Sequence, residues 1–147
     1  MGIELKNITK RFGDTLALDN VCLNFAEPKI YGLLGNNGAG KTTLLNIITN
    51  RLFADSGEVM VDNEPAADND HALNKLFMLS EKNLYPDGMK VNGAFEQAAI
   101  FYKDFSMEQA LEMTKQFGLN PRKRINTLST GYTSILKLIV ALNVNTP

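Results

Sequence analysis

Apolar and polar residues alternate in the first part of the chain, as they do in half-buried β-strands. The alternation is loose near Ile3 and returns at residues 21–25. Between these two stretches, residues 12–14 read Phe-Gly-Asp, which is typical of a turn. The pattern therefore predicts an antiparallel hairpin at the start of the chain.

A short continuous apolar run follows at residues 30–34. Such a run predicts a central strand buried on both faces, and it leads directly into a glycine-rich loop. Beyond the loop, apolar residues recur at helical spacing, which predicts a helix over residues 41–52 with its apolar face toward the sheet. Another strand is expected over residues 56–63, closed by an Asp-Asn turn, and a polar loop over residues 63–70.

The second half of the chain has helical periodicity. Helices are predicted over residues 94–102 and 106–118, and together they suggest a small helical subdomain. The second of these begins with an S-x-x-Q capping box at Ser106 and ends at Gly118, where a helix usually stops. A last helix is predicted from about residue 129 to residue 142.

The composition of the chain argues against several classes of protein. The 147 residues are 44% apolar and 21% charged, which suits one soluble domain with a sizeable core. The net charge of −1 gives no overall positive field, so no nucleic-acid partner is expected. Cys22 is the only cysteine, which excludes a disulfide framework. The longest apolar run, residues 135–142, is interrupted by Lys137 and is shorter than the roughly 20 residues of a membrane span.

The glycine-rich loop carries the strongest chemical signal. Residues 35–42 read GNNGAGKT and fit the phosphate-binding pattern G-x-x-x-x-G-K-[ST] in full. Glycines allow successive N–H groups to point at phosphate oxygens, and the helix that follows adds the positive end of its dipole. Lys41 is expected between the β- and γ-phosphates, Thr42 on the bridging Mg²⁺, and Thr43 at the α-phosphate. The predicted nucleotide-binding residues of the loop are Gly35, Asn36, Asn37, Gly38, Ala39, Gly40, Lys41, Thr42 and Thr43.

Such a loop occurs in GTPases, small-molecule kinases and ATPases, so other residues must decide between them. A GTPase should carry Asn-Lys-x-Asp to read guanine, and residues 74–77 lack the aspartate. A kinase of small molecules needs an arginine-rich lid, for which residues 122–124 are the only candidate. A solvated run of charge explains these residues better.

Residues 128–138, LSTGYTSILKL, resemble the LSGGQ signature of the ATP-binding-cassette (ABC) family. Leu128, Ser129 and Gly131 match, whereas Thr130 and Tyr132 depart from the signature. The segment lies about 90 residues after the glycine loop and beyond two predicted helices, as in the family. Residues 8–21 resemble the opening hairpin of the family, and residues 83–91 the segment after its glutamine loop, so the resemblance covers nearly the whole chain.

The resemblance implies an α/β fold. It would have a P-loop NTPase (ABC ATPase) core, an antiparallel β subdomain and a small helical subdomain. The chain would form one domain over residues 1–147. Its expected parts are the core and β subdomain over residues 1–80, the helical subdomain over 90–131, and the signature with its following helix over 128–147.

The resemblance also implies roles for residues outside the loop. Phe12 occupies the aromatic position that stacks on the adenine of ATP. Ser129, Thr130 and Gly131 would act in trans on the ATP of a second domain. The family's glutamine, a ligand of Mg²⁺ and of the attacking water, falls at Ser80, with Glu81 next to it.

The acidic residues that hydrolyse ATP are expected after the signature helix, and the family pattern places their strand immediately beyond Pro147. The catalytic residues are therefore not assigned, and the chain is expected to be a fragment that binds ATP without efficient hydrolysis. Asp62 and Glu64 imitate the acidic strand end, but their flanks favour an outer hairpin. His71 is expected to be a solvated loop residue. Without the acidic strand, an altered sheet, a swapped dimer or aggregation is expected.

The implied function is that of the ATP-binding subunit of an ABC transporter. Two such domains, in a homodimer or a heterodimer, would pair head to tail and drive a separate membrane permease from its cytoplasmic face through residues 83–90. The departures at Ser80, Thr130 and Tyr132 resemble drug-efflux and bacteriocin exporters. Two alternatives remain open: a nucleotide-binding module without turnover, and a soluble ABC ATPase that acts in translation or DNA repair.

Overall fold

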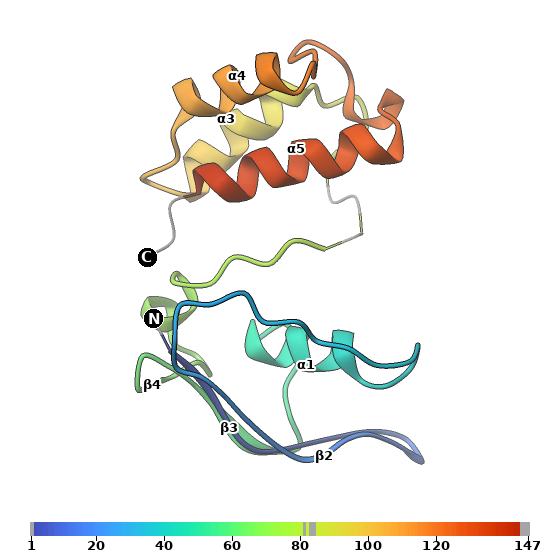
Figure 1. Cartoon of the computed structure of the whole chain (residues 1–147), viewed down its shortest axis with the longest axis vertical. Helices are drawn as coiled ribbons and strands as arrows, with labels where there is room; N and C mark the ends of the chain where they lie inside the picture. Colours follow the sequence, from blue (N-terminus) through green and yellow to red (C-terminus); the bar gives the residue numbers. More distant parts are fainter. Residues whose placement is uncertain (1, 81, 83–84, 145–147) are drawn as a thin grey trace. The chain divides into compact units, whose positions relative to one another are not determined.

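A computed structural model describes residues 2–80, 82 and 85–144 (Figure 1). The chain forms two compact units, Met1–Leu76 and Phe77–Thr146. In the described part of the chain, no helix combines the length and the apolar character that a membrane span requires.

The first unit contains a four-stranded antiparallel sheet in the order β2-β1-β3-β4. Its strands are β1 (Ile3–Phe12), β2 (Thr15–Phe25), β3 (Ser56–Val61) and β4 (Glu64–Pro65). The opening hairpin is confirmed, because Phe12 pairs with Thr15 across the turn and Ile3 pairs with Phe25 at the open end.

The hairpin that joins β3 to β4 turns at Asp62 and Asn63, whose φ angles are 50° and 66°. Asparagine and aspartate tolerate this left-handed conformation, which two-residue hairpin turns favour. The outer hairpin expected here is therefore confirmed. The loop predicted for residues 63–70 is partly wrong, because it contains β4 and the start of a short helix, α2 (Asp70–Leu73).

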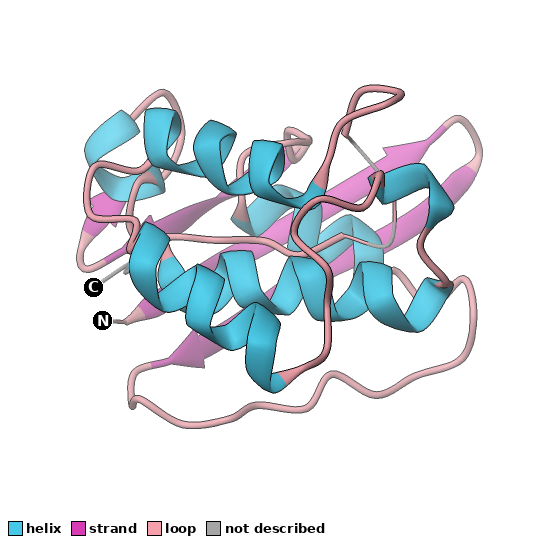
Figure 2. Ribbon diagram, turned by 90° about the horizontal axis from the view of Figure 1, so that it is seen from above, coloured by secondary structure: helices cyan, strands magenta, loops and turns pink. Residues whose placement is uncertain are grey.

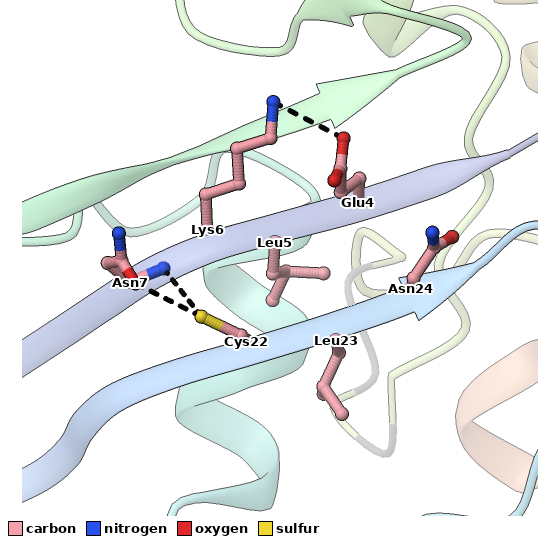
Figure 3. Close-up of a pocket in the computed structure, with 7 residues that line it drawn as sticks. All are labelled: Glu4, Leu5, Lys6, Asn7, Cys22, Leu23 and Asn24. Carbon is pink, nitrogen blue, oxygen red and sulfur yellow. Dashed lines mark hydrogen bonds and ion pairs between the residues drawn. The ribbon is translucent and has the colours of Figure 1, made fainter.

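A bulge in β1 is stabilised by the cysteine. Asn7 has a φ of 52°, and the pairing of β1 with β2 shifts between Leu5 and Ile8. The Asn7 amide donates to Cys22 Sγ at 3.2 Å, and the thiol donates back to Asn7 Oδ1 at 3.1 Å (Figure 3). The thiol therefore satisfies an amide that the bulge displaces from the regular strand pairing.

The core of the first unit lies between the sheet and α1 (Lys41–Ile48), which runs along one face of the sheet (Figure 1). Its buried side chains come from both elements and include Leu5, Ile8, Leu18, Leu44, Ile47, Ile48, Val59 and Val61. The predicted helix is four residues too long, because α1 ends at Ile48. Asn50 then takes a φ of 54°, a left-handed conformation that terminates helices.

The strand predicted for residues 30–34 is wrong. The structure has a long loop here (Figure 2), and Ile30 and Leu34 are fully or almost fully exposed. No described strand pairs with this segment, so it lacks the backbone partners and facing side chains that bury a central strand. Tyr31 is anchored locally, because its ring lies edge-on to Phe25 at 4.9 Å and its hydroxyl donates to the Glu27 carbonyl.

The second unit is helical (Figure 1). Its elements are α3 (Val91–Phe101), α4 (Met107–Gln116), the 3₁₀ turn η1 (Ile125–Thr127) and α5 (Thr130–Asn143). Phe95, Ile125, Leu136 and Ile139 are almost completely buried at its centre. The three predicted helices are confirmed.

The cap of α4 is half of the predicted capping box. Ser106 Oγ accepts the amide of Gln109 at 3.3 Å. The amide of Ser106 donates to the Asn143 carbonyl, at 3.3 Å, which ties the start of α4 to the end of α5. Gly118 has a φ of 64° just beyond α4, as its place at the helix end predicts.

An ionic cluster joins the β3–β4 turn to α2 and the residues after it. Asp62 accepts the amide of Gly2 at 2.7 Å, and Lys75 lies 3.3 Å from Asp62 and 3.4 Å from Glu64. Glu64 also lies 2.8 Å from Nδ1 of His71. The hydrogen bond from Gly2 lowers the pKa of Asp62, and the hydrogen bond with His71 lowers the pKa of Glu64.

Acid is expected to destabilise the first unit through this cluster. A carboxyl group whose pKa is lowered by folding stabilises the fold above its unfolded pKa and loses this contribution as pH falls through the folded value. The free energy of unfolding should therefore decrease below about pH 4.5, the ordinary pKa of Glu64. Urea unfolding at several pH values measures this, and Asp62→Asn should flatten the dependence. If the free energy of unfolding of Asp62→Asn depends on pH as steeply as that of the unchanged protein, Asp62 does not contribute to the acid sensitivity.

Candidate functional site

The glycine loop forms a tight turn with two glycines in the left-handed conformation. Gly38 has a φ of 86° and Gly40 a φ of 83°, and the Ala39 amide donates to the Asn36 carbonyl at 3.1 Å. Left-handed residues within a turn point successive N–H groups into one concavity, which binds anions. The φ angles of Gly38 and Gly40 are of the kind found in such anion-binding turns.

Gly40 fixes the loop against β2. A Cβ atom on Gly40 would lie 2.5 Å from the Ala17 carbonyl oxygen and 3.0 Å from Cδ2 of Leu18. Only glycine permits this approach, since the contact is with backbone as well as with a side chain. Gly40 therefore allows the loop to pack closely against β2, in addition to giving the loop its left-handed turn.

The N-terminus of α1 has no side-chain cap and no acidic residue in its first turn. Its first amide groups, those of Lys41, Thr42 and Thr43, therefore remain available to an anion at the positive end of the helix dipole. Thr42 is exposed and Thr43 is half-buried. These are the positions predicted for the Mg²⁺ ligand and the α-phosphate contact.

The ammonium group of Lys41 lies inside the loop. Its Nζ donates to the Gly35 carbonyl at 2.6 Å and to the Asn36 carbonyl at 2.7 Å. The side chain therefore bridges the start of the loop and the start of α1. A positive charge is thus fixed beside the concavity of amide groups.

Phe12 lies at the tip of the β1–β2 hairpin and is half exposed. It pairs with Thr15, two residues before Ala17, whose carbonyl meets Gly40. Two residues of strand span about 7 Å, so the ring lies within the length of a nucleotide from the loop. The predicted base-stacking residue and the predicted phosphate loop are therefore neighbours in the first unit.

The signature residues begin α5 in the second unit. Ser129 is the N-cap, and its Oγ accepts the amide of Tyr132 at 3.3 Å. Thr130 and Gly131 follow in the first turn, and both are exposed. The start of a helix is a site that suits an anion in general.

A protein-family model described as ABC transporter matches residues 18–147. The chain belongs to the ABC transporter family. Among curated relatives, the ABC transporter ATP-binding protein YtrB of Bacillus subtilis is 28% identical over 139 residues, which are 95% of this chain and 48% of YtrB. The ribose import ATP-binding protein RbsA of Lacticaseibacillus paracasei is 31% identical over 142 residues, 92% of this chain and 25% of RbsA.

A solved structure of a dimeric ATP-binding cassette bound to ADP and Pi has a TM-score of 0.79 and 30% identity. The match covers 99% of this chain and 71% of that one. The fold of an ABC ATPase cassette is thereby confirmed. The chain spans about half the length, or less, of the curated relatives it matches here.

Ser80, where the sequence predicts the position of the family's glutamine, is held by a side chain of α5. The Ser80 carbonyl accepts from Lys137 Nζ at 2.7 Å, and the Lys82 carbonyl accepts from it at 3.1 Å. Glu81, the neighbouring candidate, lies outside the described residues. Sequence reasoning missed the contacts of Lys137, although a lysine that interrupts the apolar run of residues 135–142 was a signal that its charge has a partner.

The two acidic residues that resemble the end of a catalytic strand form ion pairs within the first unit. Asp62 and Glu64 belong to the ionic cluster around Lys75, and His71 lies in α2, not in a loop as predicted. The side chain of His71 is 73% exposed and faces Glu64. Within the ranges that the structure covers, no three acidic, histidine or cysteine side chains gather in a way that could hold a metal ion.

Proposed function

We propose that the chain binds Mg-ATP through residues 35–43, with Phe12 against the adenine. The observation that carries this proposal is the uncapped N-terminus of α1 behind the left-handed glycines, with Lys41 fixed beside it. Amide groups, a helix dipole and a lysine are together the means by which such loops hold β- and γ-phosphates.

The Mg²⁺ ion would be held by the Thr42 hydroxyl together with the phosphates. Mg²⁺ commonly takes few protein ligands in nucleotide sites, and a hydroxyl at the second residue of α1 fits that pattern. The Asp62 and Glu64 carboxylates are already paired with Lys75, so they are poor candidates for a second ligand.

We further propose that two domains pair head to tail, as a homodimer or a heterodimer, so that Ser129, Thr130 and Gly131 of one face the ATP of the other. The dimeric form of the matched cassette supports this arrangement. Closure of the pair would drive a separate membrane permease on its cytoplasmic side, through residues near Lys90. Export is the direction that the signature favours, whereas RbsA is named for import.

A nucleotide-binding module without turnover is the second candidate for these 147 residues. One observation favours it: the acidic residues that resemble a catalytic strand end, Asp62 and Glu64, are bound within the ionic cluster. A group that orients or deprotonates the attacking water must reach the phosphates, and these two side chains are engaged elsewhere.

Thermal unfolding with increasing Mg-ATP tests the binding proposal. The midpoint should rise with ligand concentration, because a ligand at 100 times its Kd stabilises the folded state by about 2.7 kcal/mol. Adenosine, which lacks phosphates, should give a much smaller rise at equal concentration. An equal rise with adenosine would contradict phosphate binding by the loop.

Phosphate release from Mg-ATP tests the second candidate. Little or no release is expected from the chain, since the Asp62 and Glu64 carboxylates, which resemble a catalytic strand end, are held by Lys75. Release that disappears in Asp62→Asn would contradict this expectation and would make Asp62 catalytic.

A further inference from the structure

Asp55 contacts three successive residues of β1 from the loop that leads into β3. Its Oδ1 lies 2.7 Å from Lys10 Nζ, and its Oδ2 accepts the Arg11 amide at 2.7 Å. Its own amide donates to the Thr9 carbonyl at 2.9 Å. One residue thus fixes both the backbone and a side chain immediately before Phe12.

This contact lies where the pairing of β1 with β3 ends. The last pair between these strands is Thr9 with Ser56, and beyond it none of the described strands pairs with the tip of the β1–β2 hairpin on its β3 side. Isolated two-stranded hairpins are only marginally stable. Asp55 therefore provides the anchor that the missing strand partner would otherwise give to residues 10–12.

Lys10 connects this anchor to the aromatic ring. Its Nζ lies 5.7 Å from the centroid of the Phe12 ring, within the range of a cation–π contact. The Lys10 side chain is only 14% exposed, whereas Phe12 is 50% exposed. One side of the ring is therefore covered by a fixed cation, and the remainder is open to a planar ligand.

The charge of Asp55 is favoured by the same contacts. The hydrogen bond from Lys10, followed by that from the Arg11 amide, lowers the pKa of this carboxyl. The carboxylate is therefore fully ionised at neutral pH and holds both partners by charge-assisted hydrogen bonds.

We propose that Asp55 is a positioning residue for base recognition: through Lys10 and Arg11 it holds the Phe12 ring beside the glycine loop, where it receives the base of a nucleoside triphosphate. The inference rests on the proposed binding of ATP. It assigns part of the affinity for the base to a residue that acts on the base through Phe12. Because stacking accepts any π-face, the anchor should act on purine and pyrimidine bases alike.

Titration of the full chain with Mg-ATP and with magnesium tripolyphosphate, by calorimetry, separates the base from the phosphates. Phe12→Ala should weaken ATP binding about 10-fold and Asp55→Asn about 5-fold, since stacking of one base contributes about 1–3 kcal/mol. Neither change should alter tripolyphosphate binding. The double variant should lose no more than Phe12→Ala alone, because both act through the same ring. Asp19→Asn, an exposed aspartate on β2, is the matched control and should bind both ligands as the unchanged protein does.

Any other result of these titrations contradicts a specific part of the proposal. If Phe12→Ala weakens ATP binding and Asp55→Asn does not, or if their effects add, Asp55 does not position the ring. If Phe12→Ala has no effect, the stacking role in the proposed function fails and the inference fails with it. Equal losses of ATP and tripolyphosphate in Asp55→Asn would show general damage to the loop. If Asp55→Asn does not fold, Lys10→Met keeps the aliphatic stem, removes the ammonium group and should reproduce the selective loss of ATP affinity.

Discussion

Replacement of Lys41 by alanine should reduce the affinity for Mg-ATP by about 100-fold, since hydrogen bonds to charged groups contribute about 1.5–3 kcal/mol each. The ammonium group is the one cation fixed inside the described loop, where it lies 2.6–2.7 Å from two of the loop's carbonyls. Its removal takes away the charge that offsets the β- and γ-phosphates and also releases the two ends of the loop from each other. Isothermal titration calorimetry measures the change.

Lys29→Ala is the matched control, because Lys29 lies in the same segment before α1, is exposed and pairs with Glu27. It should bind ATP as the unchanged protein does. Circular dichroism and the unfolding midpoint check that Lys41→Ala is folded. Unchanged affinity in a folded Lys41→Ala chain would refute the assignment of residues 35–43 to the phosphates.

Gly57→Ala is expected to destabilise the first unit by about 3 kcal/mol, the sum of backbone strain and overpacking. Gly57 has a φ of 91°, and a Cβ atom there would lie 2.4 Å from the Lys6 carbonyl oxygen and 2.5 Å from that of Asn7. Both obstacles are backbone atoms of β1 and cannot move without disturbing the strand pairing. Urea unfolding followed by circular dichroism measures the loss.

Comparison with Gly13→Ala separates the cost of the steric clash from the cost of a left-handed backbone conformation. Gly13 has a φ of 57° in the hairpin turn, and a Cβ atom there would meet nothing within 4 Å. This change should cost about 1 kcal/mol, the penalty of a left-handed residue alone. If the two variants lose equal free energy of unfolding, the close approach of Gly57 to β1 does not contribute to the cost of Gly57→Ala.

The elements that sequence reasoning predicted well are those whose signals are local. The β1–β2 turn, the cap at Ser106 and the helix stop at Gly118 depend on residues within four positions of one another. The glycine loop is equally local, since its shape follows from glycines at fixed spacing. Alternation and helical periodicity then located the remaining helices and strands.

The failures and omissions depend on contacts that are distant in sequence. Residues 30–34 have the composition of a buried strand, but a strand exists only when another segment pairs with it. Asp55 reaches Lys10 across 45 positions, and Lys137 reaches Ser80 across 57. No periodicity within either segment indicates the partner, so these contacts required the structure.

Under the proposed function, the two hydrogen bonds of Lys41 with the loop would hold its ammonium group in place before a phosphate arrives. An ammonium group has three N–H donors, and the Gly35 and Asn36 carbonyls take two of them, so the third would remain for a phosphate oxygen. Because the rotamers of the lysine are already restricted without the ligand, less side-chain entropy would be lost on binding.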